Sequence, residues 1–218
     1  MTKDYIVLFD LDGTLIDSTQ AIYASFCAAF RAINGSAPSF ESMRQTIGHT
    51  LEDMFLSQGV RGDEVKQYVE QYRVAYRALM EQGTQLLPHA REAIERASEF
   101  ATLGVVTTKR GDFSQILLEK LGVWGYFSGI VGIESVKYPK PHAEPILKAL
   151  DMLECGQDRS RIYMIGDTLL DIQAAKNAHI QAIGVLCGFG KMEQMQDTQV
   201  PLYANALEAV RAIADSRM

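Results

Sequence analysis

The sequence predicts an α/β protein, in which a parallel sheet is flanked by helices and a separate all-helical unit is inserted after the first strand. The apolar run YIVLFDL at residues 5–11 ends at an Asp-Gly turn, which is typical of a strand buried on both faces. Residues 18–83 then carry helical patterns alone, and from residue 88 onward short apolar runs alternate with helical segments. Such alternation predicts βαβ units and therefore a parallel sheet.

The inserted unit begins with a helix capped by Asp17 or Ser18, whose apolar stripe ends before the stop signal Gly35. Residues 50–53 resemble a capping box, and a long amphipathic helix over residues 65–79 ends near Gly83. We interpret the methionines and tyrosines of this region as core-packing residues rather than as a ligand surface. We assign residues 17–83 to the helical domain, and residues 1–16 and 84–218 to the α/β core.

Beyond residue 88 the strands and helices of the core follow in turn. We expect four helices: one at residues 90–100, a second that ends at residue 122, a third at 146–153 and a fourth at 171–178. We expect strands at residues 103–107, 129–133, 161–165 and 180–186. Ligands bind in such sheets beyond the carboxyl ends of the strands. Polar residues directly after a strand are therefore the candidates for a functional site.

Composition restricts the possible classes of function. Of the 218 residues 47% are hydrophobic, which is enough for a buried core, and the net charge of −6 argues against a surface built for nucleic acid or anionic lipid. No apolar run approaches the length of a membrane span, and Asp10 comes too early for a signal peptide. We expect a cytoplasmic monomer or homodimer, with neither nucleic acid nor membrane as a partner.

Two carboxylates one residue apart follow the first predicted strand. Asp10 and Asp12 stand in the run DLDGT, and a carboxylate at the end of an apolar strand needs a cation or several donors to compensate its burial. The pair of Asp12 and Gly13 also forms ordinary turns, so this group alone leaves both interpretations open.

Hydroxyl groups and a lysine follow the next strands. Thr107 and Thr108 come directly after residues 103–106 and offer hydroxyl and backbone N–H groups to phosphate oxygens, although threonine is also common at strand ends. Lys140 stands between two prolines that restrict the backbone around it. This lysine either points inward as a single cation or is solvated in a loop.

A second pair of carboxylates follows the strand predicted at residues 161–165. Asp167 and Asp171 stand in the run GDTLLD, and Asp171 alone is explained equally well as a helix-start carboxylate favoured by the helix dipole. If both converge with Asp10 and Asp12, four negative charges lie close together and require nearby positive charge. One Mg²⁺ ion, which prefers hard oxygen ligands, and Lys140 would largely balance them.

Together these groups resemble the four motifs of the haloacid dehalogenase superfamily, in order and at strand ends, and most of all those of its phosphoglycolate phosphatase group. The resemblance implies a Rossmann-like core with an inserted helical cap domain of the family's first type, C1. Smaller matches lie at residues 15–18, 47–48 and 184–190. The sequence departs from the pattern at Thr108, where the group has asparagine, at Ala143, where it has proline, and at His179, where it has glycine.

The resemblance also implies a role for each residue. Asp10 is expected to be the nucleophile that carries the phosphoryl group, Asp12 the general acid and base, and Lys140 the third catalytic residue. Mg²⁺ would be bound by Asp10, the backbone carbonyl of Asp12 and Asp167, while Asp171 would position Lys140 or a metal-bound water. The residues expected to hold the phosphoryl oxygens are Gly13, Thr107, Thr108 and Lys140.

The predicted function is a magnesium-dependent phosphatase that hydrolyses a small phosphorylated metabolite, phosphoglycolate or another phosphate monoester, through an aspartyl phosphate. Asp12 favours phosphate chemistry, because the dehalogenases of the superfamily lack the second Asp of the pair. A sugar-phosphate mutase and a non-catalytic phosphate-binding regulatory module are the alternatives. Arg44, His49 and Thr50 lie around a predicted cap loop, where solvation or helix capping is the commoner role, so they are not assigned to the site.

Overall fold

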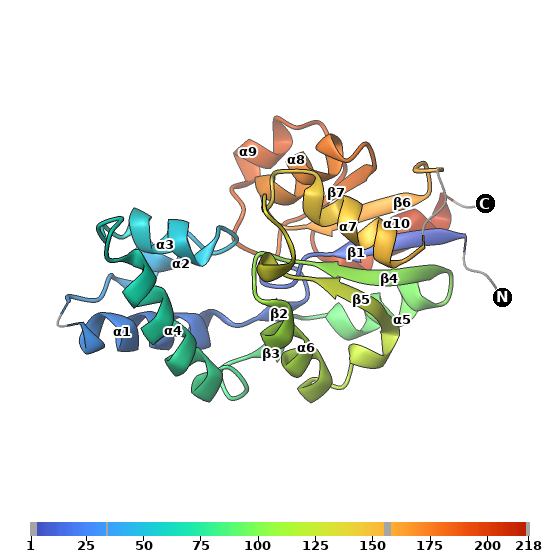
Figure 1. Ribbon diagram of the computed structural model, residues 1–218. Coiled ribbons are helices and arrows are strands. Elements are labelled where there is room, and N and C mark those ends of the chain that lie inside the picture. Colours follow the sequence, from blue (N-terminus) through green and yellow to red (C-terminus); the bar gives the residue numbers. More distant parts are fainter. Residues whose placement is uncertain (1–3, 34, 155–157, 217–218) are drawn as a thin grey trace.

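A six-stranded parallel sheet forms the centre of the protein, and a group of helices lies beyond one end of its strands (Figure 1). The computed structural model describes residues 4–33, 35–154 and 158–216. The order of the strands is β5-β4-β1-β6-β7-β8, and each neighbouring pair is parallel. The predicted α/β fold class is therefore confirmed. The strands are β1 Tyr5–Phe9, β4 Ala101–Val106, β5 Phe127–Val131, β6 Ile162–Gly166, β7 Gln181–Val185 and β8 Leu202–Tyr203.

The strand β1 is central, and its two neighbours bring distant parts of the chain to its end. Phe9, its last residue, pairs with Val105 of β4 and with Ile165 of β6. Because these strands run in the same direction, the residues that follow them emerge at one edge of the sheet. The edge therefore collects the segments after residues 9, 106 and 166.

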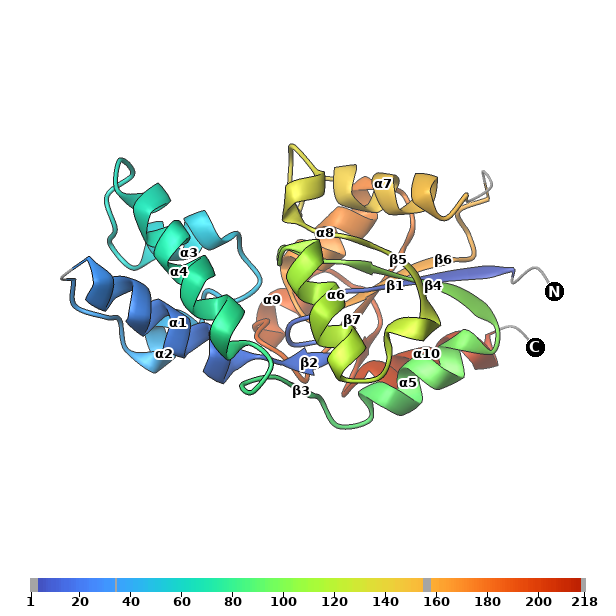
Figure 2. The ribbon, with the colours of Figure 1, turned by 60° about the horizontal axis from the view of Figure 1, so that its bottom comes forward.

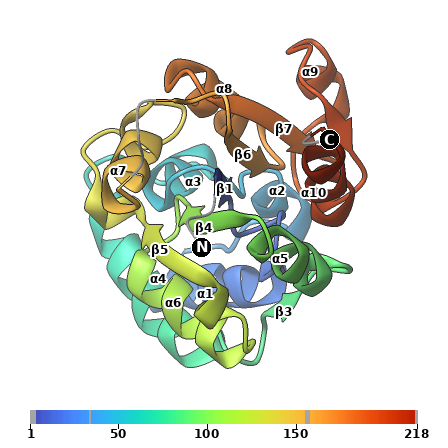
Figure 3. The ribbon, with the colours of Figure 1, turned by 90° about the vertical axis from the view of Figure 1, so that its right-hand side faces the viewer.

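Helices cover both faces of the sheet (Figure 3). Leu8 packs in an apolar cluster with residues of α7 and α8, whereas Val7 and Phe9 pack in a cluster with residues of α5 and α10. This double burial explains why the segment is apolar without alternation. The helices of the core are α5 Ala90–Ser98, α6 Gly111–Lys120, α7 Glu144–Met152, α8 Leu169–Asn177, α9 Met192–Gln196 and α10 Ala206–Asp215, with 3-10 turns at Trp124–Tyr126 and Ile133–Ser135.

The inserted helices pack through an aromatic cluster. The ring of Phe26 stacks on that of Phe55 with 4.3 Å between centroids and meets Tyr72 edge-on at 5.2 Å. Such pairs add about 0.5–1.5 kcal/mol each beyond the apolar area that they bury. The helices of this group are α1 Thr19–Ala32, α2 Phe40–Arg44, α3 Leu51–Ser57 and α4 Val65–Leu79.

Two short strands join the inserted helices to the core. β2 Ile16–Asp17 pairs antiparallel with β3 Gln85–Leu86, so the chain enters and leaves the helical group at one place (Figure 2). The division into a cap domain at residues 17–83 and a core stays a prediction. Within the described residues, no helix has both the length and the apolar character of a membrane span.

Each predicted strand and helix is present, with ends shifted by a few residues, and α4 coincides with the predicted helix over residues 65–79. The elements β2, β3 and β8 were not predicted, because two residues carry no periodicity. The helices α9 and α10 were also not predicted, although the sequence signals of α10 are clear. Asn205 caps it by accepting a hydrogen bond from the Glu208 N–H at 3.1 Å, and it buries Leu207, Val210 and Ile213.

Candidate active site

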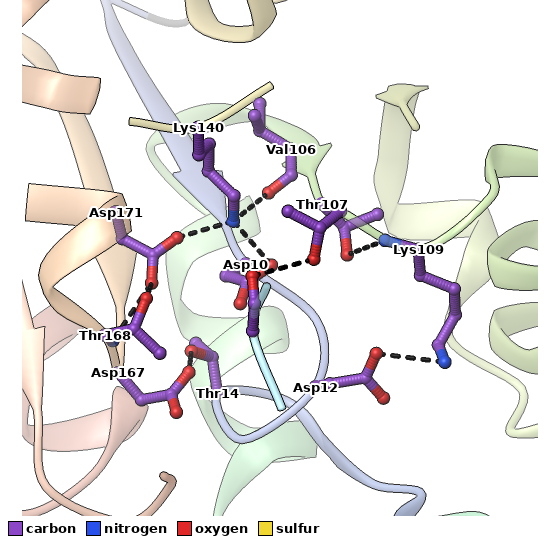
Figure 4. Close-up of polar contacts among 12 residues, drawn as sticks. Asp10, Asp12, Thr14, Val106, Thr107, Lys109, Lys140, Asp167, Thr168 and Asp171 are labelled. Carbon is purple, nitrogen blue, oxygen red and sulfur yellow. Dashed lines mark hydrogen bonds and ion pairs between the residues drawn. The ribbon is translucent and has the colours of Figure 1, made fainter. Parts of the chain in front are cut away.

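Three buried carboxylates meet where β1 and β6 end (Figure 4). Asp10 directly follows β1, Asp167 directly follows β6, and Asp171 lies in the first turn of α8. One carboxylate oxygen from each residue lies within 4.8 Å of those of the other two. The structure thus brings together three of the four carboxylates that the sequence analysis singled out.

Lys140 supplies a positive charge to this cluster. Its Nζ lies 2.9 Å from Oδ1 of Asp10 and 2.5 Å from Oδ1 of Asp171, and it donates a hydrogen bond of 3.1 Å to the carbonyl of Val106. The residue is 5% exposed, so of the two positions considered for it, inward or solvated, the structure shows the inward one. The carbonyl and the two carboxylates together fix the ammonium beside Asp10.

Asp171 is held by the start of its own helix. Its Oδ2 accepts hydrogen bonds from the backbone N–H of Thr168 at 3.0 Å and from the hydroxyl of Thr168 at 2.6 Å. Its Oδ1 contacts Lys140. Asp171 is therefore both a helix-start carboxylate and a group that positions the lysine, so the two interpretations considered for it are not exclusive.

Asp167 is held by two donors and enclosed by glycines. Its Oδ1 accepts from the hydroxyl of Thr14 at 2.9 Å, and its Oδ2 accepts from the backbone N–H of Phe189 at 2.8 Å. A Cβ atom at Gly13 would lie 2.4 Å from Oδ2, and one at Gly188 would lie 2.0 Å from it. Only glycine at these positions lets the carboxylate lie so close to the backbone.

When ionised, the three buried carboxylates carry more negative charge than Lys140 balances. Burial and the charge of the nearby Asp171 raise the pKa of Asp10 to about 7, against the opposing effect of Lys140. Burial and the charge of Asp10 also raise the pKa of Asp167 well above its ordinary value. The carboxylates outweigh burial at Lys140 and raise the pKa of its ammonium. Three hard oxygen donors with this excess charge fit a divalent cation such as Mg²⁺.

The side chain of Asp12 lies apart from the three clustered carboxylates. Its Oδ2 is 3.0 Å from Nζ of Lys109, and its Oδ1 accepts a hydrogen bond from the hydroxyl of Ser18. Lys109 also donates a hydrogen bond of 2.8 Å to the hydroxyl of Tyr76 on α4. The site therefore holds two carboxylates, Asp10 and Asp12, in different surroundings and each paired with its own lysine.

The two threonines after β4 have different partners. The hydroxyl of Thr107 is buried and accepts a hydrogen bond of 3.2 Å from the backbone N–H of Lys109. The hydroxyl of Thr108 donates a hydrogen bond of 3.0 Å to the carbonyl of Gly48, which belongs to the inserted helical region. Thr108 therefore joins the core to this region, and its predicted role in phosphate binding stays a prediction.

Comparison with known proteins identifies the family of this chain. Residues 7–185 match the family described as haloacid dehalogenase-like hydrolase. The chain belongs to this hydrolase family. The predicted family is therefore confirmed.

Several relatives and solved structures resemble the hydrolase over most of its length. It is 33% identical over 211 residues to the probable phosphatase IndB of Dickeya dadantii, covering 94% of this chain and 91% of that protein. It is 32% identical to the pyrophosphatase PpaX of Bacillus velezensis (82% of each chain), and 30% identical to a phosphoglycolate phosphatase of Salmonella paratyphi A (84% and 81%). A haloacid dehalogenase-like hydrolase structure from Streptococcus pneumoniae superposes with a TM-score of 0.86 at 29% identity, covering 97% of this chain and 99% of that one.

A pocket of the hydrolase opens beside Asp12. It encloses about 600 Å³ of space, part of it open to solvent, and residues from both the core and the inserted helices line it. His49 lines this pocket, whereas Arg44 lines a separate hollow and lies over the ring of Phe189 at 5.4 Å. Thr50 caps α3 by accepting a hydrogen bond of 3.2 Å from the Asp53 N–H.

Besides Thr168, four side chains that were not predicted as site residues support the predicted ones. Three of them contact a predicted residue directly, whereas Tyr76 reaches Asp12 only through Lys109. Lys109 directly follows the two threonines and Thr14 directly follows Gly13, so adjacency could have indicated both. The four are Thr14, Ser18, Tyr76 and Lys109.

Proposed function

We propose that this hydrolase is a magnesium-dependent phosphatase that cleaves a small phosphate monoester through an aspartyl phosphate on Asp10. One observation carries the proposal: Asp10 lies in a buried carboxylate cluster beside Lys140, while Asp12, two residues later in the sequence, lines a pocket. The names of the relatives, two of them phosphatases and one a pyrophosphatase, support phosphate as the transferred group.

The residues that would hold Mg²⁺ are Asp10 and Asp167, together with the backbone carbonyl of Asp12. When bound, the ion neutralises charge on the cluster and on the phosphoryl oxygens. Thr14 and the Phe189 N–H keep both oxygens of Asp167 in place for this role. Asp171 would complete the cluster mainly through Lys140.

In the first step, a carboxylate oxygen of Asp10 attacks phosphorus, the P–O bond to the leaving group breaks, and the bonding electrons leave with the ester oxygen. Lys140 lies 2.9 Å from Asp10, where it lowers the repulsion between the nucleophile and the anionic phosphate. Thr107, together with backbone N–H groups around Gly13, is proposed to hold the phosphoryl oxygens.

Asp12 gives a proton to the leaving oxygen and then takes one from the water that hydrolyses the aspartyl phosphate. The second step restores the Asp10 carboxylate and releases inorganic phosphate. Ser18 and Lys109 hold the Asp12 carboxylate at the pocket side of the site. We further propose that residues 17–83 form a cap over the site, because the Gly48 carbonyl contacts Thr108.

The test is release of phosphate from an aryl phosphate by the purified protein with Mg²⁺ and with chelator. Asp10→Asn should abolish turnover and prevent labelling of the protein by phosphate, whereas the matched surface variant Asp63→Asn should keep both. Full turnover by Asp10→Asn would reject the mechanism. A labelled protein that passes its phosphoryl group to a sugar phosphate rather than to water would indicate a mutase, and binding of phosphate without any turnover would indicate a regulatory module.

A further inference from the structure

The pocket beside Asp12 is where the leaving group of the substrate belongs. This step rests on the proposed function, in which Asp12 protonates the leaving oxygen. Helix α4 contributes Tyr72, Arg73 and Tyr76 to the lining, and α6 contributes Phe113. These side chains will therefore contact the part of the substrate beyond the phosphate.

Three cations line the pocket, and two of them are matched by carboxylates. Lys109 lies 3.0 Å from Asp12. Arg110 donates two hydrogen bonds, each of 2.9 Å, to the carboxylate of Asp112. Each of these two cations is therefore already balanced by a carboxylate.

Arg73 is the third cation, and it lacks such a match. Its nearest carboxylate is Glu52, at 3.8 Å between Nη2 and Oε1, and both side chains are part-exposed. Such a solvent-exposed pair contributes little to stability. Among the described residues, none accepts a hydrogen bond from the buried Nε of Arg73. Leaving a buried donor unpaired is unfavourable, and a planar guanidinium with free donors suits a carboxylate or a phosphate.

The surroundings hold the helical turn that carries Arg73 at the pocket. Tyr72, the preceding residue, is buried and stacks on Tyr76 with 5.4 Å between ring centroids. Tyr76 is in turn bonded to Lys109, which pairs with Asp12. A row of buried contacts thus runs from the general acid to the helical turn that carries Arg73.

We propose that Arg73 is a specificity-determining residue that binds a second anionic group, carried by the leaving group of the substrate. The substrate class is then a small phosphorylated acid: a phosphate monoester whose alcohol bears a carboxylate, or an anhydride whose leaving group is itself a phosphate. Both a carboxylate and a phosphate present pairs of anionic oxygens that a guanidinium can bind through two parallel hydrogen bonds.

The test compares kcat/KM with Mg²⁺ for three substrates: phosphoglycolate, pyrophosphate, and ethyl phosphate as the matched neutral ester. The wild type should prefer one of the two acidic substrates to ethyl phosphate, and the preferred one identifies the source of the second anion. Arg73→Gln should reduce that preference by about 10- to 100-fold, mainly through a higher KM, as expected for loss of a charged hydrogen bond. Arg73→Lys should restore part of it.

The surface variant Arg61→Gln, in the same helical region, is the control and should keep the wild-type preference. Thermal melting should show that Arg73→Gln is folded. Equal losses on all three substrates, or an unchanged preference in Arg73→Gln, would overturn the proposal and leave the phosphatase assignment intact. If the wild type released phosphate from neither these substrates nor an aryl phosphate, both proposals would fall together.

Discussion

The ammonium of Lys109 lies between Tyr76 and Asp12, 2.8 Å from the hydroxyl of one and 3.0 Å from a carboxylate oxygen of the other. Tyr76 belongs to α4 of the inserted region, whereas Lys109 follows β4 of the core. Lys109 therefore connects the carboxylate proposed as general acid to α4. The negative charge of Asp12 outweighs burial and raises the pKa of Lys109, so the lysine is charged in this contact.

Tyr76→Phe should weaken this connection without removing the Lys109 ion pair. We expect kcat to fall roughly three- to tenfold and the free energy of unfolding to fall by about 1 kcal/mol, the usual contribution of one hydrogen bond. Steady-state kinetics and urea unfolding measure the two effects. Tyr126→Phe, at a part-exposed tyrosine outside the site, is the control. Unchanged kinetics in Tyr76→Phe would show that the contact does not assist catalysis.

Lys140→Met should reduce stability and activity far more than Tyr76→Phe does. It removes the cation that lies between Asp10 and Asp171 and leaves both carboxylates buried without it. Loss of one partner from a buried ion pair costs about 3–5 kcal/mol, so we expect a large drop in unfolding free energy together with loss of phosphate release. Lys137→Met, three residues earlier on the exposed part of the same loop, should change neither. A Lys140→Met protein as stable as the wild type would contradict the buried network.

The metal-free protein should become less stable as the pH rises from about 5 to about 7. Asp10 has a pKa of about 7 in the folded state, against 3.8 for an ordinary aspartate. Between these values the folded state keeps a proton that the unfolded state has lost, so unfolding releases protons and the unfolding free energy falls by up to about 1.4 kcal/mol per pH unit. Asp167, whose pKa is also raised, adds an effect of the same sign.

Urea unfolding in chelator at several pH values measures this slope, and the rise in melting temperature on adding Mg²⁺ should be larger at the higher pH. The unfolding free energy depends on pH in the opposite direction through three other carboxylates, because hydrogen bonds lower the pKa of Asp112, Glu144 and Asp158. Their stabilisation is lost only as the pH falls below the ordinary carboxylate range, outside this window. A stability that rises with pH in chelator would refute the excess charge of the cluster.

The sequence predicts the positions of Asp10 and Asp167 because topology alone brings them together, whereas it leaves the inward and solvated positions of Lys140 both open. Once the apolar runs are recognised as neighbouring parallel strands, the residues after them must share one edge. The roles of Lys109 and Tyr76 could not be predicted in this way. The periodicity of α4 shows that Tyr76 faces inward, but it does not show which residue of the core its hydroxyl meets. That partner depends on how the inserted helices sit against the sheet.

The same limit explains why Asp12 was expected beside the other three carboxylates. The spacing of Asp12 from Asp10 places it near the site. After the turn at Gly13, which has a positive φ of 87°, the chain brings the hydroxyl of Ser18 to the carboxylate of Asp12. Local sequence does not predict such a contact across a loop. The helix α10 is a different case, because Asn205 and its apolar stripe were readable from the sequence.

Gly188→Ala should displace the carboxylate of Asp167 and weaken Mg²⁺ binding. The added Cβ would lie 2.0 Å from Oδ2 and 2.4 Å from Cγ of Asp167, so the carboxylate or the loop must move. We expect the Mg²⁺ concentration for half-maximal activity to rise by about tenfold or more, in line with the cost of overpacking of about 1–3 kcal/mol. Gly62→Ala, whose Cβ would meet nothing within 4 Å, is the matched control. If Mg²⁺ dependence were the same in both variants, Asp167 would not be a ligand of the ion, and the cluster would have to bind the metal through Asp10 and Asp171 instead.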